Sequence, residues 1–467
     1  MHNMEETAKE AAEIIERHKN DSITLISHMD SDGISAAALL SKALDRLEIQ
    51  HQTKFVRMLY PEVVEDLEVG NLTIFTDLGS SQLSNLRGKF EGSDTIIADH
   101  HEPEETKGWP RLIHLNAHIN GFDGAEEISG AGMAYLVAQK LNSQNKDLAA
   151  LAIVGAIGDI QNAWGKLQGI NRRIAQDGID AGTIGREKDL LLYGRHTQPI
   201  FRALENLTDP PIHDVSNSTE GCISMLKDLK IPYKTKNGYR RPIDLEEEEK
   251  RRLASELITR AMINVPDELV EYVPGLIIGE VYTLLNEREG SLLRGADEFS
   301  TCINSTARHE QPLIGLEVAK GNRDVYYRAM RKLLKYHKRC IAEGMSYIEG
   351  EGLKKGPKDK VQYFDATDVV KETFIGTITN LALGHEKSDP YKPIIGLVQR
   401  NGTTKVSARC SKLLFLKGIN MARAINDAAN SVGGEGGGHA VAAGAQIDTE
   451  KIPKFIEEFE NRLFEEL

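Results

Sequence analysis

The chain has little of what would place it in a membrane, in a secretory pathway or among disulfide-stabilised folds. Its 467 residues include only four cysteines, Cys222, Cys302, Cys340 and Cys410, which lie far apart and form no pair with metal-ligand spacing. No stretch of about 18 apolar residues occurs, so we expect no membrane span. Residues 1–6 lack the basic and then apolar pattern of a signal peptide. We therefore expect a cytoplasmic protein with reduced, structural thiols.

The chain also lacks an excess of positive charge. It has 57 Lys and Arg against 70 Asp and Glu, which gives a formal net charge of −13. This balance argues against a surface with general affinity for nucleic acids, although a local groove can still be basic. Part of the acidity lies in residues 244–249 (DLEEEE), and part lies in carboxylates that bound cations would neutralise.

The length exceeds what one hydrophobic core usually supports, roughly 250–300 residues, so we expect two or three domains. Apolar runs that alternate with helical segments predict an α/β fold whose N-terminal sheet is mainly parallel and flanked by helices. A smaller α/β C-terminal domain would follow a helical linker or insert, with a cleft between the two lobes. The predicted division is a catalytic domain over 1–204, a connecting or inserted domain over 205–300 and a C-terminal lobe over 301–467 with its core at about 360–467.

Four short segments that end in acids or histidines are the most informative feature. They are residues 27–33 (SHMDSDG), 76–79 (TDLG), 98–101 (ADHH) and 157–159 (IGD). Each follows an apolar run that we interpret as a strand, although the last run, residues 148–160, is also long enough for a buried helix. In parallel sheets, ligands bind beyond the carboxyl ends of the strands, where these side chains are expected to meet.

These residue types at that edge predict a metal site. The carboxylates of Asp30, Asp32, Asp77 and Asp159, with His28 or His100, are sufficient for two ions. A single Asp at such a position is more often a helix cap, but the full set is harder to explain that way. Mixed carboxylate and imidazole ligation without thiolate favours Mn²⁺ or Mg²⁺. Two such ions can activate a water and stabilise the leaving oxygen in phosphoester hydrolysis.

The chain resembles the DHH phosphoesterase superfamily, named for the triplet seen here at residues 99–101. Within it, the likeness is greatest to the archaeal RecJ-like nucleases. Besides the four N-terminal segments, the matching segments are residues 127–132 (EISGAG), 193–200 (YGRHTQPI), 295–299 (GADEF) through Arg308, and 436–439 (GGGH) with 442–445 (AAGA). The likeness covers most of the chain and is weakest at about 205–290. One departure is Ala117, where proline would be expected after Asn116.

The resemblance implies roles for the residues of the N-terminal motifs. The metal ligands would be Asp30, Asp32, Asp77, His100 and Asp159, with His28 as a further ligand. Asp99 would orient a histidine or complete the ligand shell, and His101 would contact the scissile phosphate.

The C-terminal part is expected to be β-rich and then helical. Strand candidates are residues 373–376, 393–398 and 405–409, and helices are expected at 324–348 and 420–430. The basic stretch within 326–339 is interpreted as a connecting helix with solvated charges. The glycine-rich segment 433–439 is expected to be a loop that a phosphate can approach closely. The resemblance implies that Ser407, Arg409, Gly437, Gly438 and His439 hold nucleic acid across a cleft from the metals.

We therefore expect a Mn²⁺- or Mg²⁺-dependent exonuclease that converts single-stranded DNA or RNA to nucleoside monophosphates. One alternative is a phosphodiesterase for short oligonucleotides or cyclic dinucleotides. Another follows from the resemblance, since archaeal RecJ-like proteins are related to a helicase-associated subunit and can bind the GINS complex. In that case residues 205–300 would dock a replisome partner. The motifs leave open the polarity of digestion and the choice between DNA and RNA.

Overall fold

The chain forms two compact units. The structure is a computed structural model that describes residues 2–105, 108–263 and 265–463. The first unit comprises residues 1–188 and 280–334, and the second comprises 189–279 and 335–467. The predicted boundaries at 204 and 300 stay a prediction.

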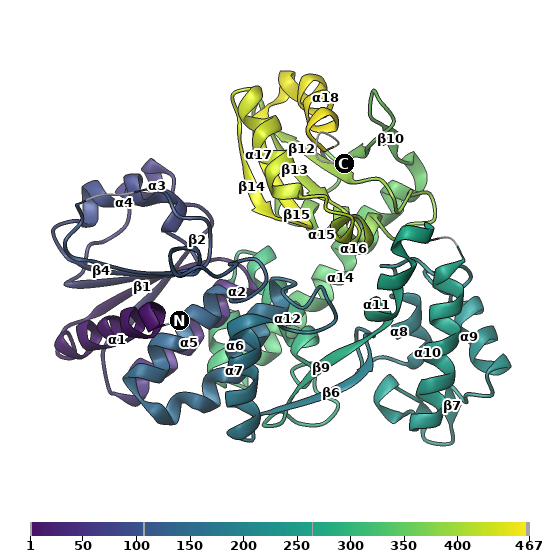
Figure 1. Ribbon diagram of the computed structural model, residues 1–467, viewed down its shortest axis with the longest axis horizontal. Helices are drawn as coiled ribbons and strands as arrows, with labels where there is room; N and C mark the ends of the chain where they lie inside the picture. Colours follow the sequence, from purple (N-terminus) through teal and green to yellow (C-terminus); the bar gives the residue numbers. More distant parts are fainter. Residues whose placement is uncertain (1, 106–107, 264, 464–467) are drawn as a thin grey trace. The chain divides into compact units, whose positions relative to one another are not determined.

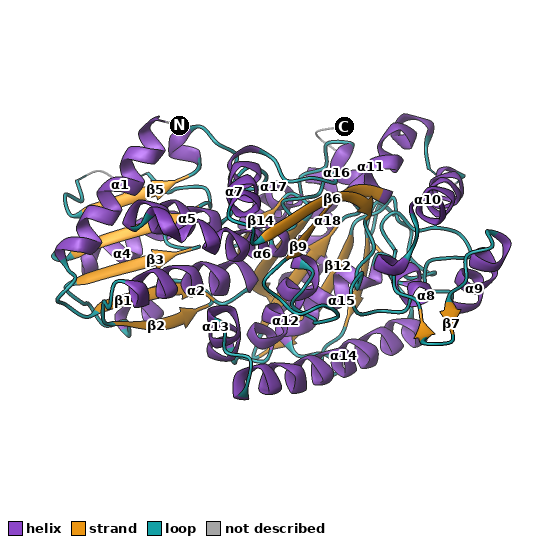
Figure 2. Cartoon of the chain, turned by 90° about the horizontal axis from the view of Figure 1, so that it is seen from below, coloured by secondary structure: helices purple, strands orange, loops and turns teal. Residues whose placement is uncertain are grey.

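The first unit is built on a five-stranded, fully parallel sheet with the strand order β2-β1-β3-β4-β5. Its strands, shown in orange in Figure 2, are β1 (Ile23–His28), β2 (His51–Val56), β3 (Leu72–Thr76), β4 (Asp94–Asp99) and β5 (Leu112–Asn116). The strands expected from apolar runs at 23–26, 72–75 and 95–98 are confirmed as the three central ones. Central strands of a parallel sheet are buried on both faces, so their sequences are continuously apolar.

Helices cover both faces of this sheet (Figure 1). The helices that lie wholly in the first unit are α1 (His2–Arg17), α2 (Ser31–Arg46), α3 (Pro61–Glu65), α4 (Leu83–Phe90), α5 (Gly130–Leu141), α6 (Ala149–Gly158), α7 (Gly169–Asp180), α12 (Ala296–Arg308) and α13 (Pro312–Lys320). Side chains alternate along each strand, so Leu25 and Ile74 belong to the core with α2 and α5, whereas Ile26 and Phe75 belong to the core with α3 and α4.

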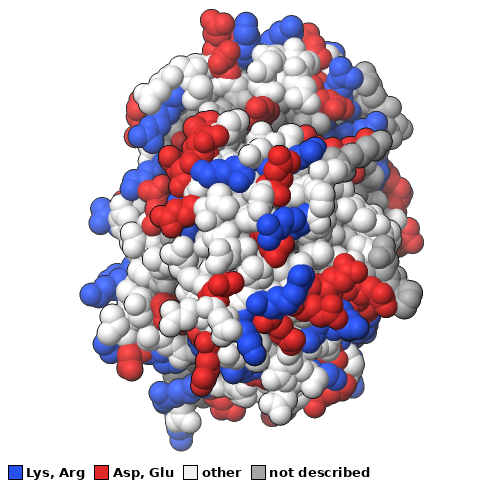
Figure 3. Space-filling model, turned by 90° about the vertical axis from the view of Figure 1, so that its left-hand side faces the viewer, with Lys and Arg blue, Asp and Glu red and all other residues white. Residues whose placement is uncertain are grey.

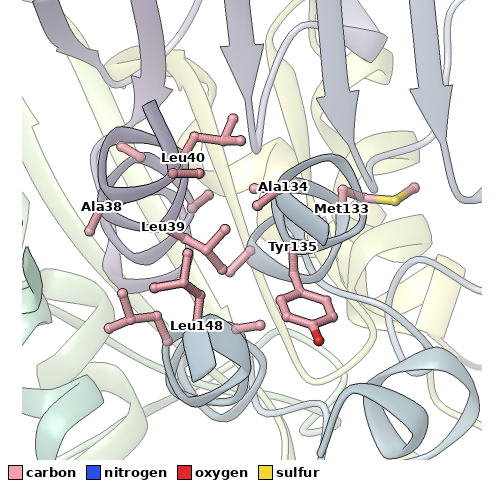
Figure 4. Close-up of a cluster of buried hydrophobic side chains, with 14 of the residues drawn as sticks. Ala38, Leu39, Leu40, Met133, Ala134, Tyr135 and Leu148 are labelled. Atoms are coloured by element: carbon pink, nitrogen blue, oxygen red, sulfur yellow. The ribbon is translucent and has the colours of Figure 1, made fainter. Parts of the chain in front are cut away.

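The larger of these cores lies where α2, α5 and α6 pack together. Figure 4 shows part of it, with Leu39 from α2, Tyr135 from α5 and Leu148, which directly precedes α6. The three helices contain many Ala and Gly residues, and such small side chains let helix backbones approach closely. This close approach matters for function, because α2, α5 and α6 each bring an end to the same edge of the sheet.

The structure decides between two alternatives that the sequence left open for this unit. The apolar run before Asp159 is the helix α6 and not a strand, so Asp159 stands at a helix C-terminus, as the C-cap residue. Periodicity could not settle the question because no residue of the run is exposed, and the alanine-rich composition favours the helix.

The second unit contains a helical part and a mixed sheet. The helical part has its own core and consists of α8 (Ile200–Glu205), α9 (Thr219–Asp228), α10 (Glu247–Met262), α11 (Val273–Ile277) and a hairpin of β7 (Lys234–Thr235) and β8 (Gly238–Tyr239). The acidic run at 244–249 contains the start of α10, where carboxylates interact favourably with the helix dipole. The strands β6 (Ile184–Leu190) and β9 (Ile278–Leu284) pair with each other, and each spans a boundary between the units.

The mixed sheet has six strands in the order β10-β11-β12-β13-β15-β14. They are β10 (Lys354–Lys355), β11 (Gln362–Asp365), β12 (Ile394–Arg400), β13 (Thr403–Arg409), β14 (Glu435–His439) and β15 (Ala442–Asp448), and the helices are α15 (Ile375–Ala382), α16 (Lys412–Leu416), α17 (Met421–Ser431) and α18 (Ile452–Leu463). The strands expected at 393–398 and 405–409 and the helix expected at 420–430 are confirmed. The long helix expected at 324–348 is α14 (Val325–Glu351).

Two expectations about the second unit are wrong. Residues 373–376 are not a strand, because they form the turn Glu372–Phe374 and the start of α15, and their apolar residues continue at the helical spacing of Ile375, Ile378 and Ala382. The glycine run is mostly not a loop, because residues 435–439 form the edge strand β14. Glycine is needed at Gly436 and Gly438 because α17 and β15 come too close for larger side chains.

No helix within the described residues is long and apolar enough to cross a membrane. Figure 3 shows acidic and basic side chains interspersed over one face of the molecule. Within the described residues, the four cysteines form no disulfide, and Cys222, Cys302 and Cys410 are buried.

Candidate metal centre

The carboxyl ends of three neighbouring strands provide the centre of a buried polar cluster. His28 is the last residue of β1, Asp77 directly follows β3, and Asp99 is the last residue of β4. The register aligns Ser27 with Thr76, so these strand ends are level. In the sheet, β2 lies on one side of β1, and β3 followed by β4 lies on the other side. Such a reversal of strand order opens a crevice at the strand ends.

Helix ends provide the other carboxylates. Asp30 is the N-cap of α2 and accepts a hydrogen bond from the backbone N–H of Gly33 at 2.9 Å. Asp32, in the first turn of the same helix, accepts hydrogen bonds from Gly130 N at 2.6 Å and Ala131 N at 3.1 Å, at the start of α5. The tertiary structure therefore fixes these two carboxylates by backbone amides.

The predicted ligands form two groups that share Asp77. His28 Nδ1 lies 3.1 Å from Asp30 Oδ2 and 3.3 Å from Asp77 Oδ2. His100 Nε2 lies 3.1 Å from Asp77 Oδ1, 3.3 Å from Asp159 Oδ2 and 3.8 Å from Asp32 Oδ2. The structure thus brings together the six residues that sequence reasoning expected to bind metal, in an arrangement that could hold metal ions.

Two glycines make this close approach possible. A Cβ on Gly130 would lie 2.5 Å from Asp77 Oδ1, and a Cβ on Gly155 would lie 2.2 Å from Asp32 Oδ1. Contacts this short cannot form without displacing the carboxylates. The glycines of α5 and α6 therefore let two helix backbones reach the carboxylate cluster.

The backbone is unusual at two positions of the site. Asp77 has φ = 59° and Ile160, next to Asp159, has φ = 60°, both in the left-handed region. This conformation is uncommon for Asp and rare for a β-branched residue such as Ile, so both positions carry backbone strain. The tertiary structure imposes conformations at Asp77 and beside Asp159 that the local sequence disfavours.

The cluster is electrostatically unfavourable without a cation. Burial and the charges of Asp77 and Asp159 hold the pKa of Asp32 well above its usual range. Burial, together with the charges of Asp30 and Asp77, raises the pKa of Asp159 to about 7, although His100 opposes this shift. These carboxylates repel one another in a buried site, and bound divalent cations would relieve that repulsion.

Neighbouring charges also shift the pKa values of Asp30, His28 and His100. Burial alone would raise the pKa of Asp30, but the charge of His28 and the N–H of Gly33 outweigh it and hold the pKa below the usual range. Burial alone would lower the pKa of His28, but Asp30 and Asp77 outweigh it and raise the pKa well above the usual range. The pKa of His100 is raised in the same way, by Asp77 and Asp159.

These residues fit a divalent cation. Both carboxylate oxygens of Asp77 are buried, and neither accepts a well-aligned hydrogen bond from the described residues. His100 Nδ1 lies 2.5 Å from the carbonyl oxygen of Gly124, which can only accept, so Nδ1 carries the proton and Nε2 faces the carboxylates. Oxygen and imidazole donors without thiolate suit Mn²⁺ or Mg²⁺.

Asp99 and His101 form a separate pair beside the ligands. Asp99 is fully buried, and its oxygens accept hydrogen bonds from the backbone N–H groups of Ser80 and His100 at 2.9 and 2.8 Å and from His101 Nδ1 at 2.7 Å. Burial alone would raise the pKa of Asp99, but the two histidines outweigh it and hold the pKa below the usual range. With its oxygens engaged in this way, Asp99 is better placed to orient His101 than to bind a cation.

Sequence reasoning assigned no role to three groups near the cluster. Arg308 is close enough to Asp30 to lower the pKa of that carboxyl, and burial lowers the pKa of Arg308 itself. The Gly124 carbonyl and the Gln161 side chain adjoin His100. Gln161 follows Asp159 by two residues, but nothing in the local sequence marks it, because its partners come from other elements.

The C-terminal residues expected to hold nucleic acid lie in the second unit, mostly on one face of its sheet. The register places Ser407 opposite Gly444 and Gly444 opposite Gly437. It also places Arg409 opposite Ala442 and Ala442 opposite His439. Directly paired residues point to the same face, so Ser407, Arg409, Gly437 and His439 share a face, while Gly438 points to the other.

Arg409 packs against the first turn of α15. Its Nη1 donates to the carbonyl oxygens of Ala408 at 2.8 Å and Ala443 at 3.2 Å. A Cβ on Gly376 would lie 2.9 Å from Arg409 Nη2 and 3.4 Å from Ser407 Oγ, so the guanidinium and the hydroxyl both adjoin the start of α15. A guanidinium, a hydroxyl and a helix N-terminus are groups that bind phosphate oxygens.

Three family models match successive parts of the chain. They are the DHH family N-terminal domain over residues 22–156, the DHH-CID domain over residues 192–273 and the DHHA1 domain over residues 361–465. An uncharacterized protein of Methanocaldococcus jannaschii is 29% identical over 453 residues, which are 95% of this chain and 94% of that protein. The likeness in sequence therefore extends along nearly the whole chain.

Solved structures share the fold at low sequence identity. RecJ in complex with Mn²⁺ from Thermus thermophilus aligns with a TM-score of 0.59 and 18% identity over 97% of this chain, which spans about half, 54%, of that RecJ. CDC45 from Entamoeba histolytica aligns with a TM-score of 0.64 and 13% identity over 97% of this chain and 99% of that one. A further exonuclease RecJ structure bound to manganese has a TM-score of 0.54, with 97% and 93% of the chains covered.

Proposed function

Because this chain belongs to the DHH phosphoesterase superfamily and has a RecJ-like fold, we propose that it is a divalent-metal-dependent exonuclease. Its substrate is single-stranded DNA or RNA, and its products are nucleoside monophosphates. The observation that carries the proposal is the buried cluster in which Asp77 joins two groups of carboxylate and imidazole donors. The RecJ structures determined with Mn²⁺ or Mg²⁺ support the choice of cation.

Two cations would be held by the two groups. His28, Asp30 and Asp77 form one set of donors, and Asp32, His100 and Asp159 form the other with Asp77 shared. When bound, such ions neutralise the carboxylates, orient a phosphodiester and make a water more nucleophilic.

The chain's own residues would position the substrate. His101, held through Nδ1 by Asp99, directs its other ring nitrogen away from that carboxylate and would donate to an oxygen of the scissile phosphate. In the second unit, Ser407 and Arg409 would bind a backbone phosphate. Gly437 and His439 on the same face would let the strand lie close to the sheet.

Digestion of end-labelled strands tests the activity directly. With Mn²⁺, the protein should shorten single-stranded DNA or RNA stepwise to mononucleotides, leave blunt duplex DNA intact, and lose activity in EDTA. Comparison of 5′ and 3′ labels gives the polarity. An intact long strand, or cleavage that persists in EDTA, would exclude the proposal, and degradation of a dinucleotide alone would favour the phosphodiesterase alternative.

The Arg409→Gln variant should bind single-stranded oligonucleotides about 10-fold more weakly, because a charge-assisted phosphate contact contributes about 1.5–3 kcal/mol. Fluorescence anisotropy with EDTA present measures this binding without cleavage. Arg400→Gln is the matched control, because Arg400 is an exposed residue at the end of β12 and its replacement changes the net charge equally. Equal weakening in both variants would indicate general electrostatic attraction and not a site at Arg409.

Metal binding should stabilise the protein more at pH 8 than at pH 6. The pKa of Asp159 is raised to about 7 and that of Asp32 is also raised, so the protonated groups stabilise the metal-free fold at low pH, and this stabilisation is lost as the pH rises through about 7. Mn²⁺ replaces those protons. Thermal unfolding should therefore show a Tm increase with Mn²⁺ that is several degrees larger at pH 8. A Tm increase independent of pH would contradict a site at these carboxylates.

The role of residues 205–300 as a docking surface for a replisome partner stays a prediction. A pull-down with purified GINS complex, with and without substitutions on the exposed surface of α10, would test it.

A further inference from the structure

A buried pair of amide side chains lies behind the candidate metal centre. Gln161 and Asn171 are 2% and 1% exposed. Asn171 Nδ2 donates a hydrogen bond to Gln161 Oε1, which leaves the Gln161 amide nitrogen pointing to the opposite side. That nitrogen donates to the carbonyl oxygens of Gly124 at 2.8 Å and Ile128 at 3.3 Å. None of these four residues is among the candidate ligands.

The segment that receives these hydrogen bonds, residues 124–131, contacts the cluster at two points. The carbonyl oxygen of its first residue, Gly124, accepts a hydrogen bond from His100 Nδ1, which sets the tautomer of that imidazole. Its last residues, Gly130 and Ala131, donate to the two carboxylate oxygens of Asp32. Residues 124–131 therefore determine the orientation of one histidine and one carboxylate of the same group.

The amide pair also fixes the middle of this segment. Asn171 Oδ1 accepts a hydrogen bond from Ser129 N at 3.4 Å, and the backbone N–H of Asn171 donates to Glu127 O at 2.8 Å. Gly124 packs tightly, because a Cβ there would lie 1.8 Å from the carbonyl oxygen of His100. The position of the segment thus depends on hydrogen bonds from Gln161 and Asn171.

We propose that Gln161, held by Asn171, is a positioning residue of the metal centre. It fixes residues 124–131 so that His100 Nε2 and the Asp32 carboxylate face the same cation. Gln161 lies two residues after Asp159, so the same short stretch both contributes a ligand and orients two others. This inference rests on the proposed function, because it presupposes that the cluster binds a divalent cation. Outer groups that orient ligands typically change metal affinity by about 10–100-fold.

The test measures binding of Mn²⁺ alone to the full chain, by the electron paramagnetic resonance signal of the unbound ion. Gln161→Met removes the amide with little change in volume. Asn145→Leu is the matched control, because Asn145 is also fully buried in the first unit and donates to a backbone carbonyl, that of Ala138, but contacts nothing in the cluster. Both variants should lower Tm, since each loses buried hydrogen bonds. Only Gln161→Met should raise the Mn²⁺ Kd, by about 10-fold or more.

The outcomes separate this inference from the function it rests on. If the unaltered protein binds no Mn²⁺, the proposed function fails. If the unaltered protein binds Mn²⁺ but the Mn²⁺ Kd of Gln161→Met lies within two-fold of its value, only the positioning role fails. The same holds if Asn145→Leu raises the Mn²⁺ Kd as much as Gln161→Met does. Should Gln161→Met not fold, Asn171→Leu takes its place, because it removes the group that orients Gln161, and it should weaken Mn²⁺ binding in the same direction.

Discussion

The Asp77→Asn variant should lose cleavage by roughly 10³-fold or more, because Asp77 faces both groups of candidate ligands. The fold should survive. Asp77 is buried without a well-aligned hydrogen bond, and its charge raises the pKa of Asp32, so its neutralisation relieves repulsion in the metal-free protein. We therefore expect the Tm in EDTA to stay equal or to rise, while the Tm increase with Mn²⁺ disappears.

Asp177→Asn is the matched control for this prediction. Asp177 is a carboxylate of the same unit that accepts hydrogen bonds from Tyr135 and Gln139 and lies outside the cluster. Its replacement should lower the Tm and leave cleavage at the unaltered rate per folded molecule. Cleavage by Asp77→Asn at more than a tenth of the normal rate would show that the cluster is not the catalytic centre.

The His101→Asn variant should separate chemistry from metal binding. His101 is oriented through Nδ1 by Asp99, and the six residues assigned to the cations do not include it. We expect kcat to fall by about 10²–10⁴-fold, the usual range for loss of a positioned proton donor, with the Mn²⁺ Kd changed by less than about three-fold. Single-turnover cleavage and Mn²⁺ titration measure the two effects on the same preparation.

His51→Asn provides the comparison for His101. His51 has a buried side chain in the same unit and hydrogen bonds to Ser41 Oγ and Ile49 O, with no contact to the cluster. That substitution should change Tm and leave both kcat and the Mn²⁺ Kd unchanged. A His101→Asn variant that loses Mn²⁺ binding together with kcat would instead make His101 a ligand, in a group with Asp77 and His100.

The central strands were predictable and the edge strands were not. β1, β3 and β4 are buried on both faces, so their sequences are continuously apolar. The edge strand β2 (HQTKFV) alternates exposed and half-buried residues and carries no such signal. The helix α6 was ambiguous for the opposite reason, since burial on nearly all sides removes the periodicity that distinguishes helix from strand.

The candidate site, like the strands, was predictable in part. Residue types and their positions at element ends were sufficient to name the candidate ligands that the structure brings together, because oxygen and imidazole donors after buried segments of an α/β sheet converge at one edge. The glycine run was misjudged as a loop, because its pairing with β15 and its packing on α17 depend on residues that the local window does not contain.

The sequence by itself determined which side chains could bind a cation and that most of them follow buried strands. Only the tertiary structure decided how each is held: Asp32 by the amides at the start of α5, Asp99 by Ser80, and His100 by the carbonyl of Gly124. The physical reason is that donor type is a property of single residues, whereas orientation comes from hydrogen bonds between segments. For Asp32 and Gly130 those segments are 98 residues apart, and nothing in the local sequence records such a contact.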